Sequence, residues 1–412
     1  MADETTDVLR AGTEQDGAAA RRAETRTLRL LVVSSMLTKV GDWQLGIVVP
    51  LAVLSRTHSP ALSLISIALR GVAYAVSPLV GSLIDRFDRR FVLVLSQVQQ
   101  ALCLALMSVL FSSQVAILLL VFLSGIGGVA STITGQFVLL PKLIGPARRP
   151  VAVAKLSSSI EYAKVIGLVL GGAAFSAHGA VFACLCIVAL YGASGLVATA
   201  LPAVPSERHT STLSADLAIG FRWLVKPEIL WLVVTMAVVN LAIGELEAAL
   251  ITQFADEDLA ALVISFVLAL GLLLGALASR FAPHVLPSWS LESRLLLLQA
   301  VAFPSLVLLA TPVAACKAVG YMVVCVAVGM SNVMSITYRQ ESIPVELAGR
   351  VNATIRMFIT GSVPLSGFIF AAASHLSGYR FWLPSAVMWA AAIAIWGGYT
   401  MRVRQEPAPA EQ

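Results

Sequence analysis

The stretch GSLIDRFDRR, from Gly81 to Arg90, carries five charged side chains between two long apolar segments. This pattern predicts a short polar loop between two membrane-spanning helices. The composition of the whole chain agrees, because 58% of its 412 residues are hydrophobic and only 12% are charged. An ordinary soluble domain has about 25% charged residues. We therefore expect an integral membrane protein with many spans.

Apolar segments long enough to cross a bilayer recur along the chain. Lipid offers no hydrogen bonds to a backbone, so each span must satisfy its own as a helix, and we expect an all-α fold. Twelve transmembrane helices are predicted, at residues 28–54, 61–80, 91–112, 115–139, 153–176, 180–201, 229–252, 258–279, 291–310, 313–335, 351–374 and 380–401.

Basic residues alternate from loop to loop and indicate the orientation. One set of loops is rich in Lys and Arg, as in the opening stretch, whereas the other includes the acidic turn at 256–258. Since basic loops stay in the cytoplasm, both termini are expected there, in the bacterial cytoplasmic (inner) membrane. Residues 1–27 are polar and expected to form a disordered tail, and residues 402–412 a second tail.

The opening stretch has an echo in the second part of the chain. GSLIDRF at 81–87 matches GALASRF at 275–281 at four of seven positions, and RRPVAVAK at 148–155 pairs with GRVNATIR at 349–356. The chain therefore divides into two bundles of six helices. The expected bundles are residues 28–201 and 229–401, joined by a polar linker at 202–228.

The spacing of the opening stretch resembles the signature loop G-x-L-x-D-R-x-x-R-R of the major facilitator superfamily. VGDWQLGIVVPLAVL at 40–54 and ESIPVELAGRVNA at 341–353 are similar to the branch with the enterobactin exporter and macrolide efflux pumps. The resemblance implies two six-helix bundles around a central cavity that opens alternately to the two sides of the membrane.

The resemblance also implies that the loop is a conformational latch, which holds the halves together by charge pairing and helix-end dipoles. The residues concerned are Gly81, Asp85, Arg86, Arg89 and Arg90. The alternative is that its arginines only set the topology, although topology requires neither an Asp nor a fixed spacing.

The predicted fifth span contains VIGLVLGG at 165–172, where exporters of the family often carry G-P-x-x-G-G. Leu168 stands in place of the proline, which weakens an argument for antiport from this motif. Gly167, Gly171 and Gly172 still permit tight helix packing.

Charged residues inside spans are the main functional clues, because each costs about 3 kcal/mol at a helix centre. Lys39 and Asp42 share a face of the first span. A carboxylate in a partly hydrated cavity can exchange a proton, so Asp42 is the first proton-coupling candidate and Glu245 the second. Internal ion pairing is the alternative for Asp42. Glu247 is two residues from Glu245, so we expect it to point elsewhere, at the rim.

Other charged residues are candidates for the substrate cavity. Lys39, Arg70 and Arg294 suit an anionic substrate, such as a siderophore with carboxylate or catecholate groups. Capping of backbone carbonyls is an equal alternative for the arginines. Glu161 shares a face with Lys164, so that it either lines the cavity or forms an internal pair.

These features favour a secondary active transporter, namely a proton-driven exporter of a small amphipathic molecule such as a siderophore or drug-like compound. The alternatives are an importer of a siderophore or nutrient, and a non-transporting membrane sensor or lipid-handling protein. The expected partners are a small-molecule substrate, protons and membrane lipid. We expect a monomer that is not an enzyme and that uses no cofactor, metal or nucleic acid.

Overall fold

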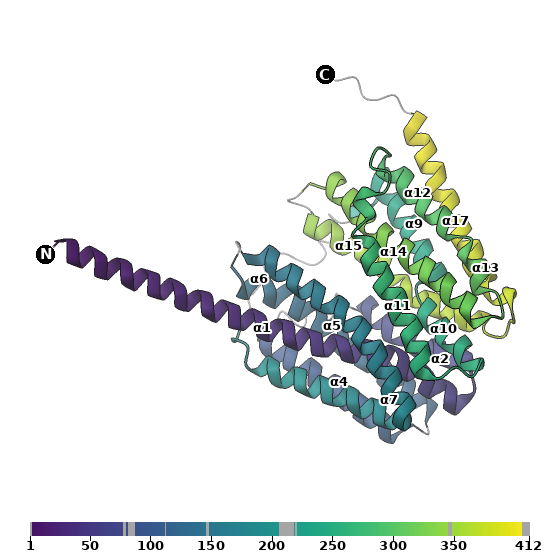
Figure 1. Ribbon diagram of the computed structural model, residues 1–412, viewed down its shortest axis with the longest axis horizontal. Helices are drawn as coiled ribbons and strands as arrows, with labels where there is room; N and C mark the ends of the chain where they lie inside the picture. The colour runs from purple at the N-terminus through teal and green to yellow at the C-terminus, as the bar shows by residue number, and fades with distance from the viewer. Residues whose placement is uncertain are drawn as a thin grey trace.

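The computed structural model describes residues 2–76, 80, 87–111, 113–145, 148–205, 218, 221–344 and 348–405. All regular elements in these ranges are helical, and the all-α prediction is confirmed. The helices form an N-terminal half, purple to teal, and a C-terminal half, green to yellow, which lie side by side (Figure 1).

In the N-terminal half, capping residues in the turns mark where helices begin. Ser59 caps the second helix ahead of Pro60, and Ser113 caps a later one, so that free backbone N–H groups are satisfied. The elements are α1 (Ala2–Thr57), α2 (Pro60–Val72), the 3-10 turn η1 (Ala73–Val76), α4 (Arg89–Val109), α5 (Gln114–Thr132), the π-helical segment η2 (Ile133–Leu139), α6 (Leu140–Leu143) and α7 (Arg149–Thr199).

The C-terminal half contains several spans that are broken near their middle. Its elements are α9 (Pro227–Ile243), α10 (Leu246–Asp256), α11 (Ala261–Ser279), the 3-10 turn η4 (Ala282–His284), α12 (Leu291–Ala302), α13 (Ser305–Leu309), α14 (Ala314–Ser342), α15 (Ala348–Gly361), α16 (Val363–Ala373) and α17 (Tyr379–Gln405).

Within the described ranges, ten helical stretches are long and apolar enough to cross a membrane, against the twelve predicted. Two features account for the difference. The long helix α7 covers two predicted spans, which Gly179 separates with a φ of 76° that favours glycine. The short helix α2 covers only 60–72 of the predicted span 61–80.

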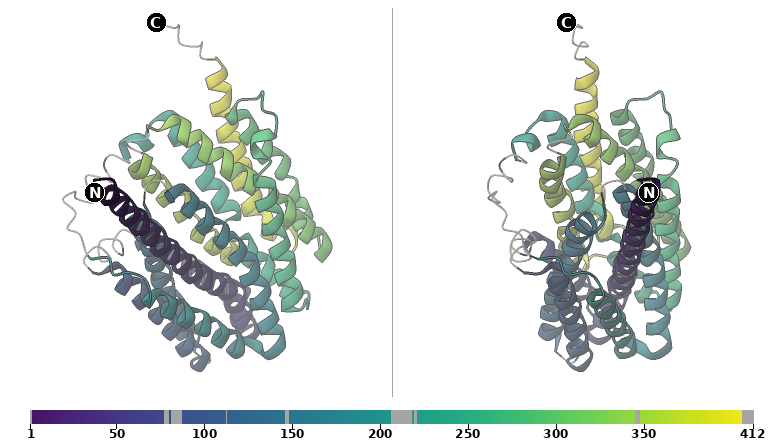
Figure 2. Two further views of the ribbon diagram at one scale, coloured as in Figure 1. Left: turned by 60° about the vertical axis from the view of Figure 1, so that its left-hand side comes forward. Right: turned by 90° about the vertical axis from the view of Figure 1, so that its left-hand side faces the viewer.

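The N-terminal segment differs from the expected disordered tail. The helix α1 begins at Ala2 and continues without a break into the first span, so that it projects from the bundle (Figure 1). Its sequence before the span is rich in Ala, Arg and Glu, which are strong helix formers. At the other terminus, α17 also extends beyond its neighbours (Figure 2).

The apolar core shows where the two halves meet. The largest buried cluster contains residues of both halves, including Leu45 and Val49 of α1 and Leu250 and Phe254 of α10. The smaller clusters, such as the one around Leu31 in the N-terminal half, each belong to one half. The halves therefore share a core at the end expected outside the cell and have separate cores at the end expected in the cytoplasm.

Contacts between helices of the two halves support this arrangement. The backbone N–H of Leu262 in α11 donates to the Ser176 hydroxyl of α7 at 3.0 Å. Helix α2 also packs against α16, and α1 against α10. These contacts close one end of the molecule above the site described next.

Candidate functional site

A cavity of about 330 Å³ lies between the two halves. Its walls come from α1, α2, η1 and α7 on one side and from α9, α10, α15 and α16 on the other. Most of the lining is apolar, with charged groups at a few places, as is typical of small-molecule sites. The lining residues are Lys39, Asp42, Trp43, Gly46, Ile67, Arg70, Gly71, Tyr74, Leu168, Gly244, Glu245, Glu247, Ala248, Ile251, Thr360, Val363 and Pro364.

Asp42 is held by three donors in the N-terminal wall. Its Oδ2 accepts from Lys39 Nζ at 2.8 Å, and its Oδ1 accepts from Arg70 Nη2 at 2.5 Å and from the Tyr191 hydroxyl at 2.9 Å. The Asp42 side chain is 8% exposed. Two cations and a hydroxyl thus compensate one buried carboxylate. These contacts offset the free-energy cost of burying its charge inside a membrane-spanning bundle.

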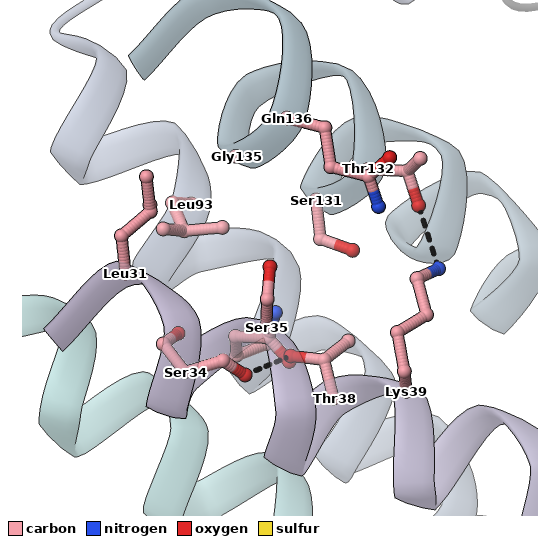
Figure 3. A pocket seen from close by; sticks show the side chains of 11 residues that line it. Leu31, Ser34, Ser35, Thr38, Lys39, Leu93, Ser131, Thr132, Gly135 and Gln136 are labelled. Carbon is pink, nitrogen blue, oxygen red and sulfur yellow. Dashed lines mark hydrogen bonds between the residues drawn. The ribbon is translucent and has the colours of Figure 1, made fainter. Parts of the chain in front are cut away.

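Lys39 is fixed from a second side, where it borders a small polar pocket inside the N-terminal half. Its ammonium donates to the Thr132 hydroxyl of α5 at 2.8 Å, as Figure 3 shows. In the same view, the Thr38 hydroxyl donates to the Ser34 carbonyl at 2.9 Å. The ammonium is therefore shared between α1 and α5, and it is not a free group in the central cavity.

The C-terminal wall is built around a break in a span. Helix α9 ends at Ile243 and α10 begins at Leu246, with Gly244 and Glu245 between them. The Glu245 N–H donates to the Ser366 hydroxyl of α16 at 3.2 Å, which replaces the bond that would continue α9. The break aims the Glu245 side chain at the cavity.

The two carboxylates of this wall line one cavity, and the prediction that they point apart is wrong. That prediction assumed a continuous helix, in which residues two apart face different ways. The Glu245 backbone leaves the helical conformation, with φ −111° and ψ 36°, and Glu247 is a cavity residue and not a rim residue. Glu247 accepts from the Tyr321 hydroxyl at 3.3 Å. For the Glu245 carboxylate, the described part of the chain supplies no hydrogen bond or ion pair.

Two predicted cavity residues lie elsewhere. Glu161 of α7 pairs with Lys164 at 2.8 Å, and its side chain is 51% exposed. Arg294 of α12 is buried and donates to the Ala282 carbonyl at 2.5 Å, which is the capping role considered as its alternative. Neither residue lines the cavity.

The three glycines of α7 have two different neighbours. A Cβ on Gly167 would lie 2.5 Å from the Val40 carbonyl oxygen, and Gly171 is similarly close to α1, within the same half. A Cβ on Gly172 would instead lie 2.6 Å from the Ala261 carbonyl oxygen in the other half. The first two glycines thus pack one bundle, and the third allows the halves to touch.

Only part of the proposed latch is described. Gly81, Asp85 and Arg86 lie outside the described residues. Arg89 is buried and donates from Nη1 to the Phe87 carbonyl at 2.8 Å, and its backbone N–H donates to the Val204 carbonyl. Arg90 donates to the Leu201 carbonyl at 3.2 Å. The described contacts of this loop therefore join α4 to the end of α7 in the same half.

Sequence reasoning did not identify Tyr191, Thr132 or Tyr321 as members of the site. A hydroxyl in an apolar span gives no sign of its partner, because the partners are about 74 to 149 residues away in the chain. One signal was available for the break, since Gly244 directly precedes a charged residue inside an apolar span.

Two helical halves with a charged cavity between them are the architecture of many membrane transporters. A sequence model of the Major Facilitator Superfamily matches residues 31–367, and the chain belongs to that family. It is a transporter and not an enzyme. A search of curated protein sequences found no match.

Solved structures agree with the family. A point mutant of the nucleoside transporter NupG superposes with a TM-score of 0.73 at 13% identity, over 90% of this chain and 99% of that one. An inward-facing bacterial homologue of the iron transporter ferroportin superposes with a TM-score of 0.72 at 17% identity, over 91% of this chain and 99% of that one. A bacterial homologue of the human lysosomal transporter Spinster, inward-facing and unoccupied, superposes with a TM-score of 0.71 at 14% identity, over 94% of this chain and 99% of that one. At these identities the likeness shows the fold alone.

Proposed function

We propose that this chain is a proton-driven exporter of a small amphipathic molecule, and that Glu245 carries the coupling proton. The contrast within the cavity supports this choice. Asp42 already accepts from Lys39, Arg70 and Tyr191, whereas the Glu245 carboxylate faces the cavity with no hydrogen bond or ion pair of its own among the described residues. A nearby cation favours the ionised form of a carboxylate, so a carboxylate that is held by two cations binds a proton less readily than one without such contacts.

The mechanism follows from the shared core at one end of the molecule. In the described state the cavity is closed toward the Gly179 end by contacts of α7 with α11 and of α2 with α16. Rocking of the two halves would separate these contacts and expose Glu245 to the other side. A proton bound from outside would then be released inside, and the substrate would move the opposite way.

Export is proposed from the resemblance of the first span, and of the segment before the eleventh span, to exporters, and a drug-like compound suits the cavity volume. We further propose that the transporter is a monomer in the bacterial cytoplasmic membrane with both termini inside. Orientation is testable with single cysteines in intact cells. A membrane-impermeant thiol reagent should label position 256 and leave position 222 unlabelled, although both are exposed, and the reverse pattern would invert the proposed topology.

The function itself is tested by untargeted metabolite profiling. A deletion strain should accumulate a compound inside the cell, and the wild-type gene should restore its normal level. Complementation with Glu245→Gln should leave the compound high, whereas the control Glu292→Gln, an acidic residue of α12 outside the cavity, should restore it. Lower intracellular levels in the deletion strain would show import, and no change in any compound would argue against the proposal.

A further inference from the structure

The charges around the cavity are unequal. Two cationic and three anionic side chains line it, so that the lining carries one net negative charge. Both cations, Lys39 and Arg70, are bound to Asp42. The cluster of Lys39, Arg70 and Asp42 thus carries one net positive charge, and the C-terminal wall carries two negative charges, at Glu245 and Glu247.

The backbone of that wall contributes two opposite helix ends. Helix α9 ends at Ile243 with the negative part of its dipole, and α10 begins at Leu246 with the positive part, so the two helix ends largely offset each other and the two carboxylates dominate the field. The Glu245 N–H, which would otherwise pair with a carbonyl of α9, is taken by Ser366.

The opposite wall offers aromatic rings. Trp43 and Tyr74 both line the cavity, and the Trp43 ring already attracts a cation, because Lys164 Nζ lies 5.6 Å from its centroid. The rest of the lining is apolar, with Ile67, Leu168 and Ile251 among its members. The cavity thus combines an apolar body with one negatively charged side.

We infer that the transported compound carries a cationic nitrogen on an apolar or aromatic body, and that Glu245 binds this cation. The inference rests on the proposed function, because the cation and the coupling proton then compete for the same carboxylate. A siderophore with several negative charges does not fit this arrangement, since the lining as a whole is negative and Asp42 holds both of its cations.

The test uses purified transporter in detergent, without any gradient. The probes are tetraphenylphosphonium and tetraphenylborate, which have the same shape and opposite charge, and the smaller benzyltrimethylammonium ion. Binding is measured by the shift in melting temperature and by titration of Trp fluorescence. The variants are Glu245→Gln, the conservative Glu245→Asp, and Glu292→Gln as the control for a lost charge in the same half.

We expect both cations to bind wild type and Glu292→Gln alike, and to bind Glu245→Gln about 10-fold more weakly, as the loss of a charge-assisted contact implies. Glu245→Asp should recover part of the affinity, and tetraphenylborate should show no dependence on residue 245. Cation affinity should also fall on acidification. Equal binding of both cations to wild type and Glu245→Gln, or preferred binding of tetraphenylborate, would overturn the inference.

The outcomes separate this inference from the function on which it rests. If cations bind through Glu245 but their affinity does not change with pH, the substrate class stands and the proton-coupling role fails. If metabolite export depends on Glu245 while neither cation shows a Glu245-dependent affinity, the proposed function stands and the cationic substrate is excluded.

Discussion

The carboxylates in the two walls of the cavity differ in the contacts that compensate their charge. In the N-terminal half, Asp42 accepts from two cations and a tyrosine hydroxyl. In the C-terminal half, Glu245 lies at a helix break without such partners among the described residues. Buried charge alone is therefore a poor guide to function in a membrane. A compensated carboxylate is one that the fold cannot lose without leaving buried cations unpaired, and an uncompensated one that faces a cavity is available for chemistry.

The largest expected effect is on the compensated side. Asp42→Asn removes the anion and leaves Lys39 and Arg70 buried without their counter-ion, which should cost about 3–5 kcal/mol of folding free energy. The expected result is low membrane yield and a much lower melting temperature in detergent. A wild-type melting temperature for this variant would show that the cluster is not structural.

A smaller effect should follow from removal of one neutral donor. Tyr191→Phe deletes a hydrogen bond of 2.9 Å to a charged acceptor and should cost about 1.5–3 kcal/mol. The matched change Tyr321→Phe deletes a longer contact of 3.3 Å to Glu247 and should cost less. Thermal unfolding of the two variants compares the two walls directly. An equal loss of stability in both variants would contradict the difference proposed between the walls.

The glycines of α7 separate packing within a half from contact between halves. Gly167→Ala would place a Cβ against the α1 backbone, and the overpacking should cost about 1–3 kcal/mol. Gly172→Ala would instead push α7 from Ala261 in the other half. It should open the closed end, seen as increased thiol labelling of a cysteine at Ser176, with a smaller loss of stability.

Gly192 of α7 supplies the control for both variants, because nothing lies within 4 Å of a Cβ placed there. Gly192→Ala should leave both the melting temperature and the labelling unchanged or slightly improved. Gly172→Ala could instead lower the melting temperature as much as Gly167→Ala and leave labelling unchanged. That result would mean that the contact between the halves cannot be loosened separately from the packing within one half.

The smallest effect on stability is expected at the uncompensated carboxylate. Glu245→Gln breaks no ion pair described here and removes repulsion from Glu247, so the melting temperature should not fall. Transport should nevertheless be lost. A clear drop in melting temperature would mean that Glu245 has a structural partner, and it would remove the contrast between the two walls.

Much of the fold was predictable from the sequence, because lipid imposes helices on every long apolar segment. The helical spans, the division into halves and the Lys39–Asp42 pair all follow from apolar length, repeated motifs and helical spacing. The prediction was wrong where a local rule did not apply. The residues preceding the first span form a helix and not a disordered tail, since their helix-forming composition continues the span.

The candidate site was less predictable, because its geometry depends on contacts between distant segments. Helical spacing brought Lys39 to Asp42, but Arg70 and Tyr191 reach the same carboxylate from other helices. The prediction from helical spacing was also wrong for Glu245 and Glu247, because the helix is interrupted there. The sequence therefore named the charged residues but not which of them neutralise one another.

The central claim is that Glu245, and not Asp42, exchanges protons in the cavity. Infrared difference spectroscopy of the carboxyl band on acidification tests it most directly, with purified wild type and Glu245→Gln, and needs no substrate. We predict that acidification of the wild type produces a protonated-carboxyl band that is absent from folded Glu245→Gln. An unchanged band in Glu245→Gln, or its loss in a folded Asp42→Asn protein alone, would contradict the claim and assign the proton to Asp42.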